Sequence, residues 1–497
     1  MEVLANLALG FQTALTPQTL FYCFLGVFLG TFVGVLPGIG SLAAVSMLLP
    51  VTFYLEPTAA LVMLAGVYYG AEYGGSTASI LLNLPGTPSS AVTCLDGYPM
   101  AQQGRAGVAL FITTIASFAG GTLGIVALVA FAPMLAEVAL MFGPAEYFAV
   151  ITFGLVASAA VTRGSALKGI IMVMVGLVLG TVGFDLHSGV PRLTFGMQEL
   201  YSGFNIVALA MGIFGVAEVI ASINRTHGAK LRERITLRSM LPGREDWRRS
   251  AGAMARGTGI GGFFGVLPGT GHAIASFLSY ATEKRLARDR SRFGRGAIEG
   301  VAAPEAANNA AVQTAFIPTL TIGIPGSAPM ALMLGALMIH GIVPGPGLMT
   351  NHPAIFWGLV ASFWIGNVLL LVLNIPLIGL WVRLLRVPYR FLYPLIICLI
   401  CIGVFSINNS VFDVGLVILF GFAGYAMRLY GFEPAPLLIG FVLGPMLEEH
   451  LRRAMLVSRG DPMIFLDRPI SAVFLALAAG LLIWAVVGGL RGRARAG

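Results

Sequence analysis

A seven-residue string occurs almost twice in this chain, at residues 34–40 and again at residues 265–271, with one difference between the copies. Each copy lies inside an apolar stretch and is followed by an acidic residue, Glu72 or Glu305, and then by a second Pro-Gly pair. Proline removes a backbone donor and glycine allows positive φ, so each string marks a point where an apolar helix breaks. The chain is therefore expected to fold as two related halves, each with interrupted hydrophobic helices.

The composition places these interrupted helices in a lipid bilayer. Of the 497 residues, 57% are hydrophobic and only 10% are charged. An ordinary soluble domain carries about a quarter charged residues. A chain of this length has room for many membrane-spanning helices of roughly 20 residues each. We predict an all-α polytopic membrane protein, without a secretory signal, because Glu2 stands where a basic segment would be needed.

Basic residues gather in two segments, 224–256 and 283–295. Such runs can bind nucleic acid, but here each one connects hydrophobic segments. Cytoplasmic loops of membrane proteins carry an excess of lysine and arginine, so both segments are placed in the cytoplasm and no nucleic-acid partner is expected. Residues 257–280 then begin and end on the same side, and about 24 residues are too few for two full spans. They are predicted to form a re-entrant hairpin with its tip at residues 267–271, surrounded by protein or by a water-filled cavity.

The first half is predicted to have the opposite orientation. Spans counted back from the basic segment place both ends of the first hairpin, residues 19–55, outside the cell. The other expected helices of this half are 59–84, 107–132, 144–160, 166–183 and 203–222, with 133–143 as an outer loop and 1–18 as a helix lying on the membrane surface. The predicted fold is therefore two inverted structural repeats with re-entrant helical hairpins and broken helices.

The second half gives a less complete prediction. Its expected spans are 356–381, 391–406, 414–427 and 470–487, with 434–445 dipping into the membrane and returning, and with the number of crossings in 297–341 left open. About twelve helical segments result, half-helices included. The chain is divided into an N-terminal membrane repeat at 1–222, a basic cytoplasmic loop with amphipathic character at 223–256, and a C-terminal membrane repeat at 257–497.

The two hairpin tips are the predicted substrate site. A helix that starts after a Pro-Gly break points unpaired N–H groups and the positive end of its dipole at the break, which favours an anion. Glycines also let membrane helices approach closely, so packing is the alternative explanation. Two copies at corresponding places favour a binding site of a secondary transporter. The predicted substrate-binding residues are Pro37, Gly38, Gly40, Ser41, Thr87, Ser89, Ser90, Gly269, Thr270, Gly271 and Ser327.

Glu72 and Glu305 are acidic residues within apolar segments. A carboxylate in the membrane is costly and usually functional, although a structural acid bonded to backbone at a helix break is the alternative. A helix start at Pro304 would place Glu305 beside amide oxygens of the next turn. The predicted cation-binding residues are Glu72, Asn83, Glu305, Asn308 and Asn309, and the coupling cation is Na⁺ or H⁺.

Other chemistry has weak support in the sequence. His272 follows the second tip, without an HExxH motif or a cysteine cluster. Cys398 and Cys401 are spaced as CxxC, but no partner His or Cys lies nearby, so they are assigned to helix faces. The Gly-rich string at 257–262 has no preceding strand and no Walker lysine. We predict no catalytic residue, no metal site and no organic cofactor.

At these motifs the chain resembles the large membrane subunit of the tripartite tricarboxylate transporters, the TctA-type permeases, over essentially its whole length. The matching strings are 34–40, 85–90, 265–271, 303–310 and 324–328, and the stretch 293–310 is the most characteristic. The resemblance implies cation-driven uptake of citrate or a related carboxylate across the bacterial inner membrane, by symport. It also implies a small four-span membrane subunit and a periplasmic solute-binding protein as partners. His272 and Gln313-Thr314 stand where the resemblance implies smaller residues, which bears on the choice of carboxylate.

We therefore predict a secondary active transporter, not an enzyme, that takes an organic anion from a periplasmic binding protein. One competing class is an intramembrane enzyme with Glu305 and His272 as acid and base, which would need a nucleophile or metal at recognisable spacing. The other is an anion channel, which duplicated broken helices suit less well than they suit alternating access. Accumulation of substrate against its gradient in proteoliposomes would separate these classes.

Overall fold

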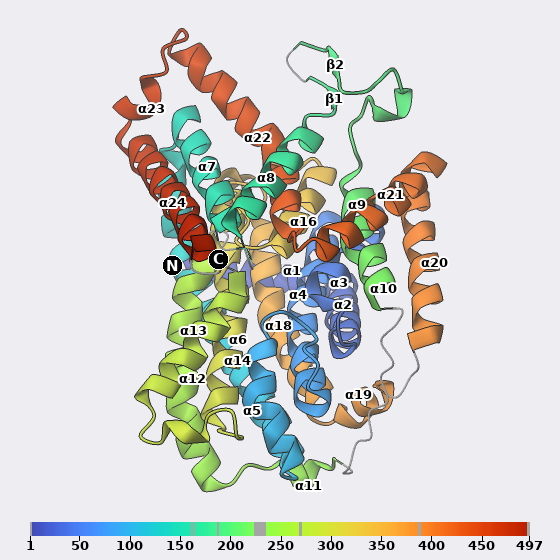
Figure 1. The fold of residues 1–497 in the computed structure, drawn as a ribbon, viewed down its shortest axis with the longest axis vertical. Helices are drawn as coiled ribbons and strands as arrows, with labels where there is room; N and C mark the ends of the chain where they lie inside the picture. Colours follow the sequence, from blue (N-terminus) through green and yellow to red (C-terminus); the bar gives the residue numbers. More distant parts are fainter. Residues whose placement is uncertain are drawn as a thin grey trace.

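The computed structural model describes residues 2–160, 162, 165–185, 188–222, 235–267, 271–385 and 389–494, and most of them are α-helical (Figure 1). The first half contains α1 (Glu2–Ala14), α2 (Pro17–Val35), α3 (Gly40–Leu48), η1 (Leu49–Tyr54), α4 (Pro57–Leu82), α5 (Ala91–Gln102), α6 (Ala106–Leu140), α7 (Pro144–Ala160), α8 (Ala166–Gly180), β1 (Gly183–Phe184), β2 (Pro191–Arg192), η2 (Gln198–Leu200), α9 (Ile206–Ala210), the π-helical segment η3 (Met211–Val216) and α10 (Ala217–Ser222). The strands β1 and β2 pair antiparallel.

The secondary-structure elements described in the second half are also all helices. It contains α11 (Leu237–Met240), α12 (Arg244–Val266), α13 (Gly271–Leu286), η4 (Arg290–Arg292), α14 (Glu299–Thr314), α15 (Phe316–Thr321), α16 (Ala328–Ile339), α17 (Gly347–Asn351), α18 (Pro353–Asn374), α19 (Ile378–Leu384), α20 (Tyr389–Asn408), α21 (Val411–Leu429), α22 (Ala435–Val457), α23 (Ile464–Asp467) and α24 (Pro469–Ala494). The separate segments outnumber the expected twelve, because several expected helices are divided, as in α9–η3–α10 and α18–α19.

Helix length and composition agree with a membrane protein. Among the described helices, 4 are long and apolar enough to cross a membrane, namely α2, α6, α18 and α21. Several other apolar helices are shorter. Among them, α7, α8 and α16 have 10–17 residues, and α3 has 9. A full span needs roughly 20 residues. The short helices α3 and α16 begin at the Pro-Gly breaks, as expected, whereas α7 and α8 were expected as spans and have 17 and 15 residues. The protein is an all-α, multi-pass membrane protein.

The first hairpin, α2 and α3, packs on α4 through a row of glycines. Gly26, Gly30 and Gly34 each face the backbone of α4. A Cβ atom at Gly30 would lie 2.4 Å from the carbonyl oxygen of Val67. Small residues every four positions let two membrane helices approach this closely. Because the whole row is needed for contact, the glycines of α2 have a packing role in addition to any role at the tip.

The second hairpin, α12 and α13, packs on α14 in the same way. Gly257, Gly261 and Gly265 face the backbone of α14, and a Cβ atom at Gly261 would lie 2.1 Å from the carbonyl oxygen of Ala307. The helix begins earlier than expected, at Arg244, so residues 244–256 of the basic segment are its first turns. Acidic residues in the first turn cause this early start, because they favour the positive end of the helix dipole.

Helices of the two halves are interleaved. The helix α14 packs on α6 of the first half, and α4 packs on α18 of the second half. Further out, α8 packs on α22, and η3 with α10 packs on α21. The glycines again permit close contact, since a Cβ atom at Gly176 would lie 2.1 Å from the carbonyl oxygen of Leu437. Neither half forms a core that is independent of the other.

Two expected breaks at prolines are wrong. The helix α6 continues through Pro133 to Leu140, so the expected outer loop 133–143 shrinks to residues 141–143. The helix α22 continues through Pro445 and does not turn back. An interior proline costs one helical hydrogen bond. In α6 buried alanines lie on both sides of Pro133, at Ala132 and Ala136, and in α22 Gly440 and Gly444 pack on α8 just before Pro445. Tertiary packing therefore keeps both helices intact.

The segments on either side of α9–α10 lie at opposite ends of the molecule. Figure 1 shows the β1–β2 hairpin projecting beyond the helices at the top, whereas α11 lies at the bottom. The hairpin is held by Arg192, which contacts Glu448 of α22 at 2.8 Å, and by Arg452, which contacts Asp185 at 2.8 Å. The described helices α9, η3 and α10 therefore lead from the hairpin toward the end at which α11 lies.

Candidate functional site

One large cavity lies where the breaks of both halves meet. Its volume is about 690 Å³. Its wall includes residues 37–43 and 84–88 from the first half, and residues 271–274 and 327–329 from the second half. The remaining wall includes residues 431–436, between α21 and α22. The fold thus brings together four breaks that are far apart in the sequence.

Five helices begin at this cavity. The first residues of α3, α5, α13, α16 and α22 all line it: they are Gly40, Ala91, Gly271, Ala328 and Ala435. The first turn of a helix carries N–H groups without intrahelical partners and the positive end of the helix dipole. Five such ends around one space make the cavity attractive to an anion, although few cationic side chains line it.

Glycine is required where the backbone turns at the tips. Gly38 has φ of 92° and Gly40 has φ of 75°, and in the second half Gly271 has φ of 65°. Residues other than glycine adopt this left-handed backbone conformation only at a cost in conformational energy. The second break is packed against the first hairpin, because a Cβ atom at Gly86 would lie 2.4 Å from the carbonyl oxygen of Gly34. The first residue of the repeated string therefore supports the neighbouring break.

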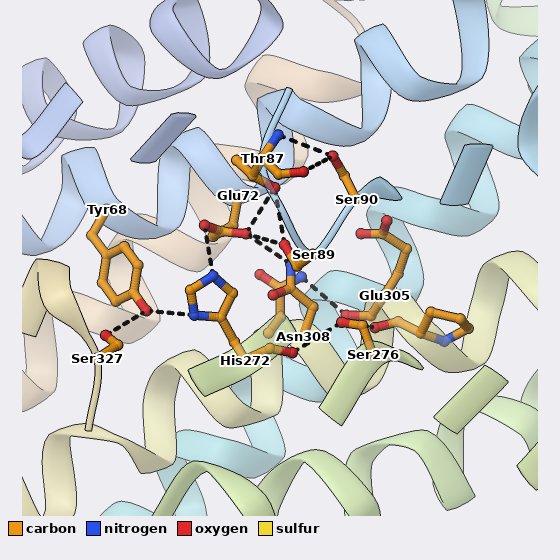
Figure 2. Close-up of polar contacts among 12 residues, drawn as sticks. Tyr68, Glu72, Thr87, Ser89, Ser90, His272, Ser276, Glu305, Asn308 and Ser327 are labelled. Atoms are coloured by element: carbon orange, nitrogen blue, oxygen red, sulfur yellow. Dashed lines mark hydrogen bonds and ion pairs between the residues drawn. The ribbon is translucent and has the colours of Figure 1, made fainter. Parts of the chain in front are cut away.

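Glu72 of α4 is fully buried behind the cavity wall and accepts hydrogen bonds from both halves (Figure 2). Ser89 Oγ donates to Glu72 Oε2 at 2.6 Å, and Thr87 Oγ1 donates to the same oxygen at 3.1 Å. Asn308 Nδ2 of α14 donates to it at 3.2 Å. The other carboxylate oxygen, Oε1, lies 3.2 Å from His272 Nε2. One carboxylate thus joins the second break of the first half to α13 and α14.

His272 connects this carboxylate to the cavity. Its ring belongs to the cavity wall, at the first turn of α13. Its Nδ1 atom lies 3.0 Å from Tyr68 Oη, and that hydroxyl lies 3.3 Å from Ser327 Oγ at the start of α16. Figure 2 shows the imidazole between Tyr68 and Glu72. The chain of contacts runs from Ser327 through Tyr68 and His272 to Glu72.

Glu305 of α14 lies in a separate cluster. Ser76 Oγ donates to Glu305 Oε1 at 2.6 Å, Thr93 Oγ1 donates to the same oxygen, and Ser117 Oγ donates to Oε2 at 3.3 Å. Asn309 Nδ2 donates to the backbone oxygen of Glu305 at 3.1 Å. These hydroxyls come from α4, α5 and α6, so Glu305 binds the first half to α14. The cluster does not include a residue of the cavity wall.

The expected helix start at Pro304 is wrong. The helix α14 begins at Glu299, and Pro304 lies in its interior. Asn309 therefore sits one turn beyond Glu305 and presents its amide nitrogen to the backbone. A cage of amide oxygens around the Glu305 carboxylate, as the helix-start hypothesis required, is not what the described side chains form.

The predicted substrate-binding residues fall into three groups. Those in the cavity wall are Pro37, Gly38, Gly40, Ser41, Thr87, Gly271 and Ser327. Ser89 and Ser90 lie behind the wall, where Ser89 binds Glu72 and Ser90 Oγ accepts from the Thr87 backbone N–H at 3.1 Å. Gly269 and Thr270 lie outside the described residues. The cavity therefore collects most of the described members, and the two serines shape the break.

The predicted cation-binding residues divide into two clusters and one separate residue. Glu72 meets Asn308, and Glu305 meets Asn309. Asn83 is exposed and ends α4 in a left-handed conformation, with φ of 57° and ψ of 31°. Among the described contacts, Asn83 does not bind either carboxylate, so the structure brings four of the five predicted residues into two pairs and leaves Asn83 apart.

Several residues of the site are absent from the sequence-based prediction. Tyr68 and Ser76 lie one helical turn before and after Glu72, so the spacing of polar residues along α4 was the available signal. Arg428 and Glu218 also line the cavity, and Arg428 Nη1 contacts Glu218 Oε2. Both stand in apolar segments, where an ionisable residue is a functional hypothesis by default.

Comparison with known proteins agrees with these features. The sequence pattern of the tripartite tricarboxylate transporter TctA family matches residues 20–439. An uncharacterized 52.8 kDa protein in the TAR-I ttuC' 3' region of Agrobacterium vitis is 52% identical over 493 residues, which cover 99% of this chain and 98% of that protein. An uncharacterized protein in the TAR-II ttuC' 3' region of the same organism is 56% identical over 233 residues, covering 47% of this chain and 96% of that protein. No solved structure matches the chain. Its repeated broken helices and its match over most of its length place the chain in the tripartite tricarboxylate transporter TctA family.

Proposed function

We propose that this chain is the permease subunit that carries an organic carboxylate through the cavity between the two halves. The observation that carries this proposal is the convergence of five helix N-termini on one cavity of about 690 Å³. A carboxylate there would accept hydrogen bonds from first-turn amides and from short hydroxyl side chains such as Ser41 and Thr87. A tricarboxylate or a related anion such as citrate is the proposed substrate, in line with the family.

Transport is proposed to be secondary and active, with Na⁺ or H⁺ as the coupling cation. The pair of Glu72 and Asn308 supports this role best, because Glu72 contacts His272, a residue of the cavity wall. A cation bound near Glu72 would attract an anion in the cavity across a few ångströms of protein. This attraction would lower the free-energy cost of placing the anion there. Glu305, Asn309 and Asn83 remain in the proposed set of cation-binding residues with less support from their contacts.

Two inverted repeats are proposed as the basis of alternating access. The matched rows of glycines on α2 and α12, and the reciprocal packing of α4 on α18 and α14 on α6, support a duplicated architecture. In transporters of this kind, one group of helices rocks against another around a fixed site. The hairpin tips would then be reached from the two sides of the membrane in turn.

The partners follow from the family and remain part of the proposal. The substrate is proposed to arrive on a periplasmic solute-binding protein, and a small four-span membrane subunit is proposed to complete the complex in the bacterial inner membrane. Within the described chain, the parts that take part in the proposed transport are the cavity and the helix ends around it.

An intramembrane enzyme is the rival with a specific requirement. It needs Glu305 and His272 to act together as acid and base. His272 contacts Tyr68 and Glu72 instead, whereas Glu305 contacts three hydroxyls. Among the described side chains, these two residues do not contact each other, so the geometry favours transport over this chemistry.

Uptake into vesicles tests the proposal against a channel. The chain, the four-span subunit and the binding protein would be produced together, and right-side-out membrane vesicles would be given labelled citrate or labelled succinate. We expect accumulation above the external concentration, and its collapse when an ionophore dissipates the cation gradient. Equilibration without accumulation would indicate a channel. Absence of entry for every carboxylate, with all three proteins present, would contradict the proposal.

A further inference from the structure

A charged pair lies in the cavity wall among residues of the outer helices. Arg428 belongs to the last turn of α21, and Glu218 belongs to α10, directly after the π-helical segment η3. Arg428 Nη1 contacts Glu218 Oε2. The arginine side chain is 33% exposed, whereas the glutamate side chain is 8% exposed. The glutamate is therefore fixed in the protein, and the guanidinium reaches the open side.

Arg428 differs in charge from the other side chains that line the cavity. Of the described side chains that line it, Arg428 is the only arginine or lysine, and the other ionisable side chains in the wall are Glu218, His272 and Glu433. The hairpin tips offer partial positive charge through backbone amides, whereas Arg428 offers a full charge that protein environments do not remove. The wall thus has two different kinds of anion-binding group.

These two kinds of group come from different parts of the fold. The tips belong to the interleaved hairpins around α4 and α14, whereas Arg428 belongs to the helices packed around η3. A cavity of about 690 Å³ is within the size range of small-molecule sites, roughly 300–1,000 Å³, and is larger than one carboxylate group needs. An anion with a single carboxylate could use the tips or the guanidinium, but not both.

We propose that Arg428 binds a second carboxylate of the substrate, while the hairpin tips bind the first. This inference rests on the proposed carboxylate transport and names Arg428 as the residue that distinguishes anions with two or more carboxylates from monocarboxylates. A guanidinium carries five N–H donors, so Arg428 can keep its contact with Glu218 and still bind a substrate carboxylate in the bidentate manner. Glu218 is a positioning residue that holds the guanidinium at the wall.

The contrast with a monocarboxylate follows from the hydrogen bonds that the guanidinium can form. A second carboxylate would receive charge-assisted hydrogen bonds from Arg428 at this wall. A monocarboxylate of the same length would place a methyl group there, and the guanidinium would keep only its contact with Glu218 and its exposure to the cavity. Because charge-assisted bidentate pairs are strong, we expect at least a ~10-fold preference for the dicarboxylate.

Paired ligands of equal length test the proposal. Succinate and butyrate have the same four-carbon chain, and butyrate lacks one carboxylate. Binding of each, and of citrate, to the purified full-length protein would be measured by calorimetry in detergent. The wild-type protein is expected to bind succinate at least ~10-fold more tightly than butyrate. In Arg428→Gln this ratio should fall to about 1, because succinate loses more affinity than butyrate does. Arg428→Lys should give an intermediate ratio, because it keeps the charge and loses the fork geometry.

A double variant protects the test against misfolding. Arg428→Gln leaves Glu218 without its partner, whereas Glu218→Gln with Arg428→Gln replaces the ion pair by two neutral amides. The loss of the succinate preference should persist in this double variant. Arg453→Gln is the matched control, since Arg453 is an exposed arginine that pairs with Glu449 on α22. It should keep the wild-type ratio.

The outcomes separate this inference from the proposed function. If the double variant retains the wild-type preference for succinate, or if Arg428→Gln weakens butyrate and succinate equally, Arg428 is not the second carboxylate site. If the wild-type protein binds both ligands with equal affinity, the inference fails and carboxylate binding at the tips stands. If the wild-type protein binds none of the three acids, the proposed function itself fails.

Discussion

The two hairpins use the same packing and different chemistry. Each begins with a helix whose glycines, four positions apart, face the backbone of the next long helix, α4 or α14. Each long helix carries one buried carboxylate. Glu72 on α4 is linked through His272 to the cavity, whereas Glu305 on α14 is enclosed by hydroxyls of the other half. Duplicated packing has therefore been combined with an acid beside the cavity in one half and an acid away from it in the other.

This difference shows why similarity of sequence is a weak guide to the role of each acid. Both carboxylates are bound by residues of the opposite half, so both hold the halves together. Only the surroundings of Glu72 include a residue of the cavity wall. The two acids also lie at different heights on their helices, because Glu72 follows Ala71, which faces Gly34, whereas Glu305 precedes Ala307, which faces Gly261.

The largest expected effect would test whether the glycine rows are equivalent. Gly30→Leu and Gly261→Leu would each drive a side chain into a backbone carbonyl, at 2.4 Å and 2.1 Å for the Cβ atom alone. Overpacking usually costs ~1–3 kcal/mol, and because a backbone atom cannot rotate away we expect the upper end or more, with little folded protein recovered. Size-exclusion chromatography in detergent would measure this recovery.

The second hairpin offers a matched control for this experiment. A Cβ atom at Gly259, on the same helix as Gly261, would meet no atom within 4 Å. Gly259→Leu should therefore give normal recovery. If Gly30→Leu also gives normal recovery while Gly261→Leu does not, the two rows are not equivalent and the comparison breaks at this point.

The tips should be equally sensitive in transport. Gly40 and Gly271 occupy the same place in the repeated string and have φ of 75° and 65°. Valine at either position, or at Gly38, would be strained by at least ~1–2 kcal/mol and would move the helix start that faces the cavity. We expect uptake to fall at least ~10-fold in each variant, with membrane insertion nearly intact. Full transport in all three would assign the tips to packing.

An intermediate effect is expected at Asp96, which has no acidic counterpart in the second half. Asp96 Oδ1 accepts from the backbone N–H groups of Gly294, Gly296 and Ala297 at 2.8–2.9 Å. At the same place in α16, five residues after its first residue, stands Met333. Asp96→Asn should lower stability by about 2 kcal/mol, because bonds to a charged acceptor are weakened. Met333→Leu should cost less, under ~1.5 kcal/mol, and thermal unfolding would rank the two.

The smallest effect separates the two acids in function. Glu72→Gln and Glu305→Gln both keep the shape of the side chain and remove its charge. We expect Glu72→Gln to raise the cation concentration for half-maximal uptake more than Glu305→Gln does, because Glu72 contacts the cavity wall through His272. The apparent affinity for substrate should change less, through coupling between the sites. The opposite order would make Glu305 the cation ligand and Glu72 the structural acid.

The sequence predicted the breaks better than it predicted the continuous helices. At residues 34–40 and 265–271 one helix ends and the next begins, as expected, and the re-entrant course of each hairpin stays a prediction. The prediction failed at Pro133 and Pro445, where both helices continue through the proline and their packing outweighs the local signal for a break. The break at residues 83–90 was found, but α5 was missed, since its low hydrophobicity gave no span to recognise.

Local chemistry alone determined that this chain lies in a membrane, that its helices break at two repeated Pro-Gly strings, and that glycines and short hydroxyls gather at those breaks. These properties belong to neighbouring residues, so they can be read along the chain. Tertiary structure decided that Glu72 faces His272 while Glu305 faces Ser76, and that Arg428 joins the cavity. These contacts join residues that are at least 200 positions apart, as with Glu72 and His272, and they depend on how the two halves interleave. No periodicity within a single helix carries that information.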